Sequence, residues 1–506
     1  MGNLMMSLQA VTQWEVLLLM LIGVIMGIIF GSIPGFTITM AVALTLPFSF
    51  GLEPLSGIAL MMGVWLGGAS GGLISSILLG IPGTPSSVAT TFDGFPMAKK
   101  GEPGRALAIG LWSSFFGSLI GGAILIIGAP LLSQWAIQFG PWEFFALMVL
   151  GLSAIASLGN GSLIKGILAG LLGMFFGMFG LDPVLGTERF TFGAVSMMAG
   201  FSYLPVLIGI FAFSQLLSEI GKHSGGKSEV DTKISLSYPI GKTLKDMGGS
   251  FVNVIRSSII GTIIGALPGA GSSIANIMSY DVAKKLSKKP ELYGTGTKDG
   301  VIAAETANNS SEGGALIPTL ALGIPGSAVT VMMMGALLVH GIQPGPYFFV
   351  SQPVLAYGIF LSFFISAILM LVVQSLGIRL FLKINDIPMH FLLPVVIILC
   401  ALGSFALNNR VFDIWVLLLF GVIGYLMKNS GFSLPAFVLG IILGPLTEEN
   451  LRRAVATSSD LTLFFTRPLS GVILVLAILS ILYGIITEIR YTKKMKQLET
   501  ESSSDL

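Results

Sequence analysis

The chain has 506 residues, of which 53% are hydrophobic and only 10% are charged, and its formal net charge is +2. Soluble domains carry about 25% charged residues, so this composition excludes a soluble enzyme domain and indicates an all-α integral membrane protein. The near-neutral charge gives no reason to expect a nucleic-acid partner. The single cysteine, Cys400, excludes an intrachain disulfide and a cysteine-based metal site.

Pro-Gly pairs interrupt four of the apolar segments, and they occur in two sets. Pro34-Gly35 and Pro82-Gly83 are followed, at offsets of 234 and 243 residues, by Pro268-Gly269 and Pro325-Gly326. Proline removes a backbone donor, so a membrane helix tolerates the pair only where the freed backbone groups face protein, water or a ligand. We predict two repeats built around discontinuous or re-entrant helices, an architecture typical of transporters. The alternative is that each pair only kinks a helix for packing.

Apolar segments recur from Val16 to Ile486. A transmembrane helix needs about 20 residues, so we predict about 10 to 13 hydrophobic segments. The predicted organisation is a first membrane repeat at 1–220, a cytoplasmic linker at 221–250, a second membrane repeat at 251–467, an extra span at 468–487 and a cytoplasmic tail at 488–506.

Lys and Arg cluster in four places, and the positive-inside rule puts these in the cytoplasm. The clusters are Lys99 to Arg105, Lys222 to Lys245, Lys284 to Lys298 and Arg490 to Lys496. The N-terminus and the turns at Glu53 and Gln343 have no positive charge, so we place them outside. The two copies then enter the membrane from opposite sides, which predicts inverted-topology repeats.

Three arginines, Arg452, Arg453 and Arg467, contradict this topology because it places them outside. The alternative is that the segment from Thr447 to Pro468 lies at the membrane interface.

Small hydroxyl residues follow the breaks. A helix that restarts after Pro-Gly presents free N–H groups and a partial charge of roughly +0.5, enough to hold a carboxylate without a buried arginine. From Val16 to Phe92 the only charged residue is Glu53, so an anion bound there must be held by backbone groups, hydroxyls or a cation. The predicted substrate-binding residues are Pro34, Gly35, Thr37, Pro82, Gly83, Thr84, Ser86, Ser87, Thr90, Pro268, Gly269, Ser272, Ser273, Pro325, Gly326 and Ser327.

Glu305, Asn308, Asn309 and Glu312 share one helical face, because they are spaced i, i+3, i+4 and i+7. A carboxylate at the centre of a membrane helix costs about 3 kcal/mol on insertion scales, so such residues usually line a pathway or bind an ion. We predict that they couple transport to Na⁺ or to H⁺, and we expect no other metal or cofactor. The alternative places residues 299–312 at the membrane surface, where water solvates them.

One motif suggests an enzyme instead. Gly68-Ala69-Ser70-Gly71 matches the GxSG pattern of rhomboid intramembrane serine proteases, whose serine needs a histidine on a neighbouring helix. His223 falls in the linker, and His340 and His390 lie near predicted span ends. We therefore expect no catalytic dyad and no enzyme activity.

Five segments resemble the large membrane subunit, TctA, of the tripartite tricarboxylate transporter family. They are GSIPGFTITMA from Gly31, GIPGTPSSVATTFDGFPMAKKG from Gly80, GALPGAGSSIAN from Gly265, KDGVIAAETANNSSEGGALIPTLALGIPGS from Lys298 and GPLTEENLRRA from Gly444. The resemblance implies a secondary transporter of di- and tricarboxylates, citrate among them, in the bacterial inner membrane. It implies two partners, a small four-span membrane subunit and a periplasmic solute-binding protein, and import driven by a Na⁺ or H⁺ gradient.

The expected mechanism is alternating access, in which the broken-helix tips meet at one site near the bilayer midplane and their movement carries the substrate across. The N-terminus is expected in the periplasm and the C-terminus in the cytoplasm. A carboxylate channel or passive pore is the alternative, because repeats alone do not require an energised cycle.

Overall fold

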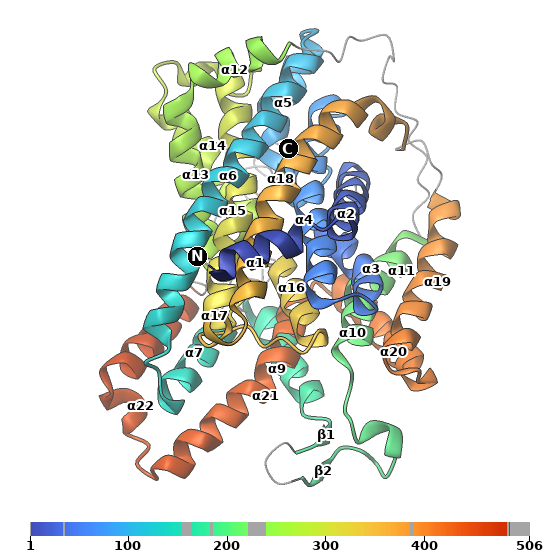
Figure 1. Cartoon of the computed structure of the whole chain (residues 1–506), viewed down its shortest axis with the longest axis vertical. Coiled ribbons are helices and arrows are strands. Elements are labelled where there is room, and N and C mark those ends of the chain that lie inside the picture. The colour runs from blue at the N-terminus through green and yellow to red at the C-terminus, as the bar shows by residue number, and fades with distance from the viewer. Residues whose placement is uncertain are drawn as a thin grey trace, which may run out of the picture.

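The computed structural model of the chain is a bundle of α-helices (Figure 1). It describes residues 2–33, 36–153, 163–182, 186–220, 239–384, 389–482 and 485. Within these ranges, the strands are the two-residue pair β1 (Gly180–Leu181) and β2 (Glu188–Arg189). The prediction of an all-α membrane protein is confirmed. Several predicted features lie outside the described residues: Pro34, Gly35, most of the linker (221–238), the last residues of the extra span and the tail 488–506.

Six helices of the described chain are long and apolar enough to cross a membrane, so the protein is a multi-pass membrane protein. They are α2 (Trp14–Ser32), α4 (Pro54–Leu78), α6 (Pro103–Ala136), α18 (Pro353–Ile384), α20 (Val411–Asn429) and α21 (Leu434–Thr457).

The other helices are shorter or more polar. They are α1 (Gly2–Val11), α3 (Ile38–Phe50), α5 (Val88–Lys99), α7 (Pro141–Ser153), α9 (Leu163–Gly177), α13 (Phe251–Ala266), α14 (Gly271–Leu286), α15 (Lys298–Leu322), α16 (Ala328–Val339), α19 (Met389–Asn408) and the helix Pro468–Leu482. The smallest pieces are η1 (Pro85–Ser87), η2 (Val195–Met197), α10 (Tyr203–Leu207), the π-helical η3 (Ile208–Phe213), α11 (Ser214–Ile220), α12 (Ile240–Gly248), η4 (Pro290–Leu292), α17 (Phe348–Ser351) and α22 (Leu463–Thr466).

The helix α15 lies at the centre of the molecule although its sequence is polar. It packs against α6, α13 and α14, and also against α4 and α5. Every residue from Gly300 to Leu316 is buried. Its many alanines and glycines allow this, because small residues let neighbouring membrane helices approach closely. The alternative that water solvates the polar segment is therefore excluded for residues 300–312.

Two helix pairs, α2 with α4 and α13 with α15, are packed through matching backbone contacts. At each contact a glycine lies so close to a carbonyl group of the other helix that an added Cβ would overlap it. The contacts are Gly27 to Val64, Gly31 to Gly68, Gly261 to Ala307 and Gly265 to Ser311. The second pair repeats the first at the offsets of 234 and 243 residues. The two pairs thus share one packing pattern, whereas the inverted orientation of the repeats stays a prediction.

Three of the basic segments meet at the end of the molecule that carries α12, at the top of Figure 1. There Asp246 binds Arg105 at 3.0 Å and Lys298 at 3.3 Å. The segments predicted to lie outside contact one another away from this end. His340 Nε2 lies 3.3 Å from Ser49 Oγ, and Ser7 Oγ donates a hydrogen bond to Val354 O. The structure therefore groups the segments as the positive-inside rule does, while the side that each group faces stays a prediction.

The three arginines that contradict the predicted topology each bind an acidic residue. The ion pairs are Arg452 with Asp182 at 3.1 Å, Arg453 with Glu449 at 2.5 Å and Arg467 with Glu143 at 2.6 Å. The positive-inside rule counts Lys and Arg and not net charge, so these ion pairs do not decide which side this segment faces. Its place at the membrane interface stays a prediction.

Candidate functional site

The chain leaves helical geometry between α4 and α5, where Gly80 adopts a φ of +70°. Thr84 and Ser87 then form a capping box. The Ser87 hydroxyl donates to Thr84 O at 2.9 Å and accepts from the Ser76 hydroxyl at 2.8 Å. Ser86 is buried, and its hydroxyl lies 3.0 Å from that of Thr84. Ser87 therefore holds the loop together, whereas Ser86 contributes little to its shape.

The break between α15 and α16 is built in the same way. Gly323 ends α15 with a φ of +71°, and Ser327 and Thr330 form a second capping box. The Ser327 N–H donates to Thr330 Oγ1 at 2.8 Å. Pro325 and Gly326 are buried between the two helices. Each of the two predicted hydroxyl loops thus caps the helix that follows it, a role that the sequence analysis did not assign.

The breaks within one half of the chain touch each other. The Gly269 N–H donates to Gly326 O at 3.0 Å, which places Pro268-Gly269 beside Pro325-Gly326. An added Cβ on Gly326 would overlap the Gly265 carbonyl, and one on Gly83 would overlap the Gly31 carbonyl. These breaks are therefore packed against the ends of α13 and α2, with no room for a side chain.

Hydroxyl residues also begin the helices that follow the first break of each half. Thr37 caps α3 by accepting from the Met40 N–H at 3.1 Å. Ser272 and Ser273 lie in the first turn of α14 and are half-buried. Ser272 lies close to the Glu312 carboxylate. This contact brings a predicted substrate-binding residue next to a predicted cation-coupling residue.

Glu305 connects the two halves of the chain. Its Oε1 accepts from the Thr90 hydroxyl of α5 at 2.5 Å, and its Oε2 accepts from the Ser114 hydroxyl of α6 at 2.9 Å. Nearby, the Ala89 N–H donates to Asn276 Oδ1 at 2.7 Å, which ties α5 to α14. The predicted substrate-binding residue Thr90 and the predicted coupling residue Glu305 therefore belong to one buried polar cluster.

Asn308, Asn309 and Glu312 present oxygen atoms that have no donor. The amide of Asn308 donates to Ala69 O at 3.0 Å, and the amide of Asn309 donates to Ser118 Oγ at 3.3 Å. In the described chain, Asn308 Oδ1, Asn309 Oδ1 and Glu312 Oε1 are buried without a hydrogen-bond partner. An unpaired buried acceptor costs about 1–3 kcal/mol, so it is retained where a ligand satisfies it. Oxygen acceptors of this kind fit a hard cation such as Na⁺.

Trp65, on α4, borders the buried polar cluster of α15. Its indole lies close to the Glu312 carboxylate, but the N–H and Glu312 Oε1 do not form a hydrogen bond in this arrangement. The described residues contain no group of three His, Cys, Asp or Glu side chains that could hold a metal ion. A cation would therefore be held by carboxylate, amide and hydroxyl oxygens together.

Asp93 is a buried residue that the sequence analysis missed. Its Oδ1 accepts the backbone N–H groups of Gly294, Gly296 and Thr297 at 2.7–3.0 Å, and its Oδ2 accepts the Tyr280 hydroxyl at 2.9 Å. Asp93 thereby fastens the loop between α14 and α15 to α5. A lone carboxylate in an apolar segment was the clue, since the same reasoning identified Glu305.

Ser70, the serine of the GxSG motif, is bound by a neutral amide. Its hydroxyl donates to Gln374 Oε1 at 2.8 Å, and Gln374 Nε2 donates back to Ser70 O at 3.2 Å. Both side chains are fully buried. His340 lies against Ser49 instead. This geometry gives Ser70 a packing role between α4 and α18.

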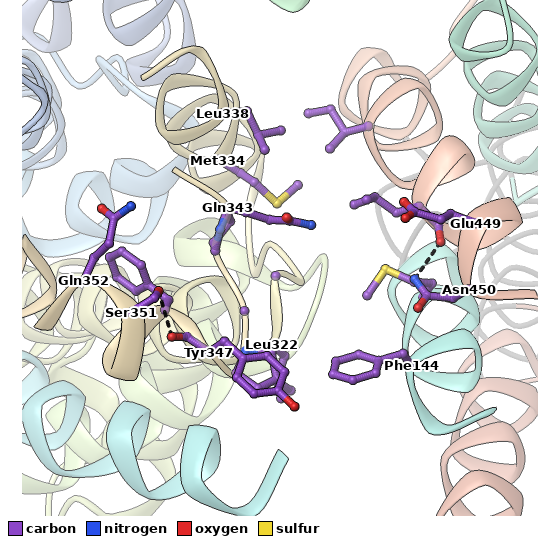
Figure 2. A pocket seen from close by; sticks show the side chains of 18 of the residues that line it. Phe144, Leu322, Met334, Leu338, Gln343, Tyr347, Ser351, Gln352, Glu449 and Asn450 are labelled. Carbon is purple, nitrogen blue, oxygen red and sulfur yellow. Dashed lines mark hydrogen bonds between the residues drawn. The ribbon is translucent and has the colours of Figure 1, made fainter. Parts of the chain in front are cut away.

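A cavity of about 440 Å³ opens beside the break between α15 and α16 (Figure 2). One wall comes from Leu322, Gly323, α16 and the loop that contains Gln343, and the other comes from α7 and α21. Figure 2 shows Gln343 reaching from the first wall toward Glu449 and Asn450 on the second. Leu322 is the last residue of α15 and Gly323 is its C-cap. The cavity therefore reaches the C-terminal end of the helix that carries the buried polar cluster.

Comparison with known proteins gives one family and two relatives. The family model described as "Tripartite tricarboxylate transporter TctA family" matches residues 17–439. An "Uncharacterized 52.8 kDa protein in TAR-I ttuC' 3'region" of Agrobacterium vitis is 35% identical over 470 residues, which are 93% of each chain. An "Uncharacterized protein in TAR-II ttuC' 3'region" of the same organism is 37% identical over 231 residues, 46% of this chain and 96% of the relative. No solved structure matches the chain significantly.

Proposed function

The chain belongs to the tripartite tricarboxylate transporter TctA family, and we propose that it is the large, substrate-translocating subunit of a secondary transporter. It imports di- or tricarboxylates across the bacterial inner membrane. Its partners are a small four-span membrane subunit and a periplasmic binding protein that delivers the substrate. The N-terminus lies in the periplasm and the C-terminus in the cytoplasm, as the distribution of basic residues favours.

The observation that supports this function most directly is the set of buried oxygens on α15. Asn308, Asn309 and Glu312 keep acceptors without donors in a helix that is buried from Gly300 to Leu316. A helix core that served packing alone would not retain them, because each costs stability. A Na⁺ ion, or a proton on a carboxylate, would satisfy them and so couple transport to an ion gradient.

The substrate site of this proposal lies at the breaks next to these oxygens. Helices α3, α5, α14 and α16 all start just after a break, so their N-terminal turns favour an anion. The capping boxes use part of this capacity, and Ser86 and Ser272 supply hydroxyls that are not part of them. Thr90 and Glu305 join the substrate site to the cation site by a direct hydrogen bond.

Uptake into proteoliposomes that contain this chain and its partner subunits tests the function. A secondary transporter accumulates citrate or another di- or tricarboxylate above its equilibrium level under an inward Na⁺ or H⁺ gradient, whereas a passive pore only equilibrates it. Equilibration without accumulation under either gradient contradicts the proposal.

The two buried carboxylates of α15 test the coupling. Glu305→Gln and Glu312→Gln are expected to abolish or shift the Na⁺ or pH dependence of uptake at normal protein levels, because each removes a charge from the buried cluster. Glu291→Gln is the matched control, because Glu291 is exposed in the loop before α15. Sodium and pH profiles that stay unchanged in both variants reject the assignment.

A further inference from the structure

The cavity beside the break between α15 and α16 has the size of a small-molecule site. Its volume of about 440 Å³ lies within the roughly 300–1,000 Å³ of ligand pockets. Apolar side chains such as Met334 and Leu338 form about half of its lining, and polar groups form the rest. Polar groups in such a lining can orient a small polar ligand through specific contacts.

Arg453 is the cationic side chain in this lining. It binds Glu449, four residues earlier on α21, at 2.5 Å, and its side chain remains 65% exposed. Surface ion pairs of this kind contribute little stability, so the guanidinium can exchange its partner at low cost. Arginine binds carboxylates through two parallel hydrogen bonds, which makes a substrate carboxylate a suitable replacement for Glu449.

The opposite wall supplies a neutral hydrogen-bonding group. Gln343 comes from the loop after α16 and reaches toward Glu449 and Asn450 across the cavity (Figure 2). Its amide donates and accepts hydrogen bonds, so it can bind a second carboxylate or a hydroxyl group of the same molecule. The two walls thus offer contacts to both ends of a small polyanion.

The cavity also lies next to the break between α15 and α16. Leu322 and Gly323 line it, and the buried break at Pro325 and Gly326 follows directly in sequence. The lining loop at Gln343 belongs to the group of segments that the positive-inside rule places outside. A substrate that arrives from that side would meet this cavity before it meets the break.

We propose that this cavity is an outer binding site in which a di- or tricarboxylate docks before it reaches the broken helices, with Arg453 as the residue that recognises a carboxylate. Glu449 occupies Arg453 when the site is empty and is displaced by the incoming carboxylate. The inference rests on the proposed transport function and adds a residue that determines specificity for anions with two or more carboxylates.

A cysteine-protection experiment tests this site. Leu338→Cys is made in a Cys400→Ala chain, assembled with its partner subunits, and labelled with a membrane-impermeant maleimide from the outside. Citrate and succinate are expected to slow the labelling, whereas acetate is not. Glu53→Cys, on the same predicted side but outside the cavity lining, is expected to label at a rate that neither anion changes.

Two further substitutions are expected to change the citrate concentration for half-protection in opposite directions. Arg453→Gln raises the citrate concentration for half-protection roughly tenfold, the effect of losing one partly exposed charge-assisted contact. Glu449→Gln lowers it, because Arg453 no longer has an internal partner. Lys285→Gln, in an exposed ion pair with Asp281 on α14, leaves it unchanged.

The outcomes separate this inference from the proposed function. If uptake of citrate or succinate occurs but neither anion slows labelling of the Leu338→Cys chain, the outer site is rejected and the transport function stands. Protection that is identical in the parent, Arg453→Gln and Glu449→Gln chains rejects the role of Arg453. If no di- or tricarboxylate is taken up at all, the transport function itself fails.

Discussion

Ser86 and Ser87 are adjacent in sequence, but their hydrogen bonds give them different roles. Ser87 takes part in the capping box and accepts from Ser76, whereas Ser86 has one hydroxyl neighbour, Thr84. Position along the chain could not separate these roles, because both residues follow the same Pro-Gly break. The roles differ because the loop backbone directs the Ser87 side chain toward Thr84, so Ser87 takes part in the capping box.

We predict that Ser86→Ala raises the half-saturating substrate concentration about threefold to tenfold, the effect of one lost hydrogen bond to the substrate. Ser87→Ala is expected instead to lower the free energy of unfolding by about 1 kcal/mol, because it removes a helix cap. Uptake kinetics and thermal unfolding of the purified protein measure the two effects. Wild-type kinetics in Ser86→Ala would count against its role in binding.

Asp93 fixes the loop between α14 and α15 by accepting three backbone N–H groups and the Tyr280 hydroxyl. Asp93→Asn removes the charge and replaces one acceptor oxygen with a donor, so we expect a loss of about 2–3 kcal/mol in local stability. Trypsin should then cut faster after the exposed Lys288. Asp281→Asn, which breaks an exposed pair with Lys285, should not change the cutting rate.

At the scale of helices, the Pro-Gly breaks could be placed from sequence because proline and glycine act locally. The helices end and restart at 79–87, 267–270 and 323–327, at three of the four predicted positions. The burial of α15 could not be predicted in the same way. A polar helix is compatible with a water-exposed interface or with a polar core, and only the surrounding helices α6, α13 and α14 decide between them.

The glycine contacts between α13 and α15 make a prediction at this scale. Gly265→Ala places a methyl group against the Ser311 carbonyl, so we expect a loss of about 1–3 kcal/mol and little uptake activity. Gly248→Ala in α12 is the matched control, because an added Cβ there meets nothing within 4 Å. Relative protein levels and thermal unfolding compare them. Equal stability of the two variants would show that the close contact is unimportant.

At the scale of the whole molecule, the sequence predicts which segments share an end, because charge distribution follows membrane topology. The contacts of Asp246 with Arg105 and Lys298 agree with that grouping. The sequence could not predict the cavity of Figure 2, whose walls come from α7, α16 and α21 and whose shape depends on their packing. Long-range packing leaves no local pattern in the chain.

Cysteine labelling tests the inverted orientation. In the Cys400→Ala chain, Glu53→Cys should react with an impermeant maleimide in intact cells, whereas Lys288→Cys should react only after permeabilisation. Cys400 itself is buried and 1% exposed, so its replacement removes a background thiol without opening a surface. These two turns occupy corresponding places in the two copies. Labelling of both from the same side would contradict inverted repeats.

The glycine contacts of α2 with α4 and of α13 with α15 have a consequence for motion. Backbone lies directly on backbone there, so no side chain at these contacts can change rotamer and let one helix slide past the other. Each helix pair should therefore move as one rigid body. Any displacement during a working cycle must then occur where helices meet through side chains, and the cavity between α16 and α21 separates two walls of this kind.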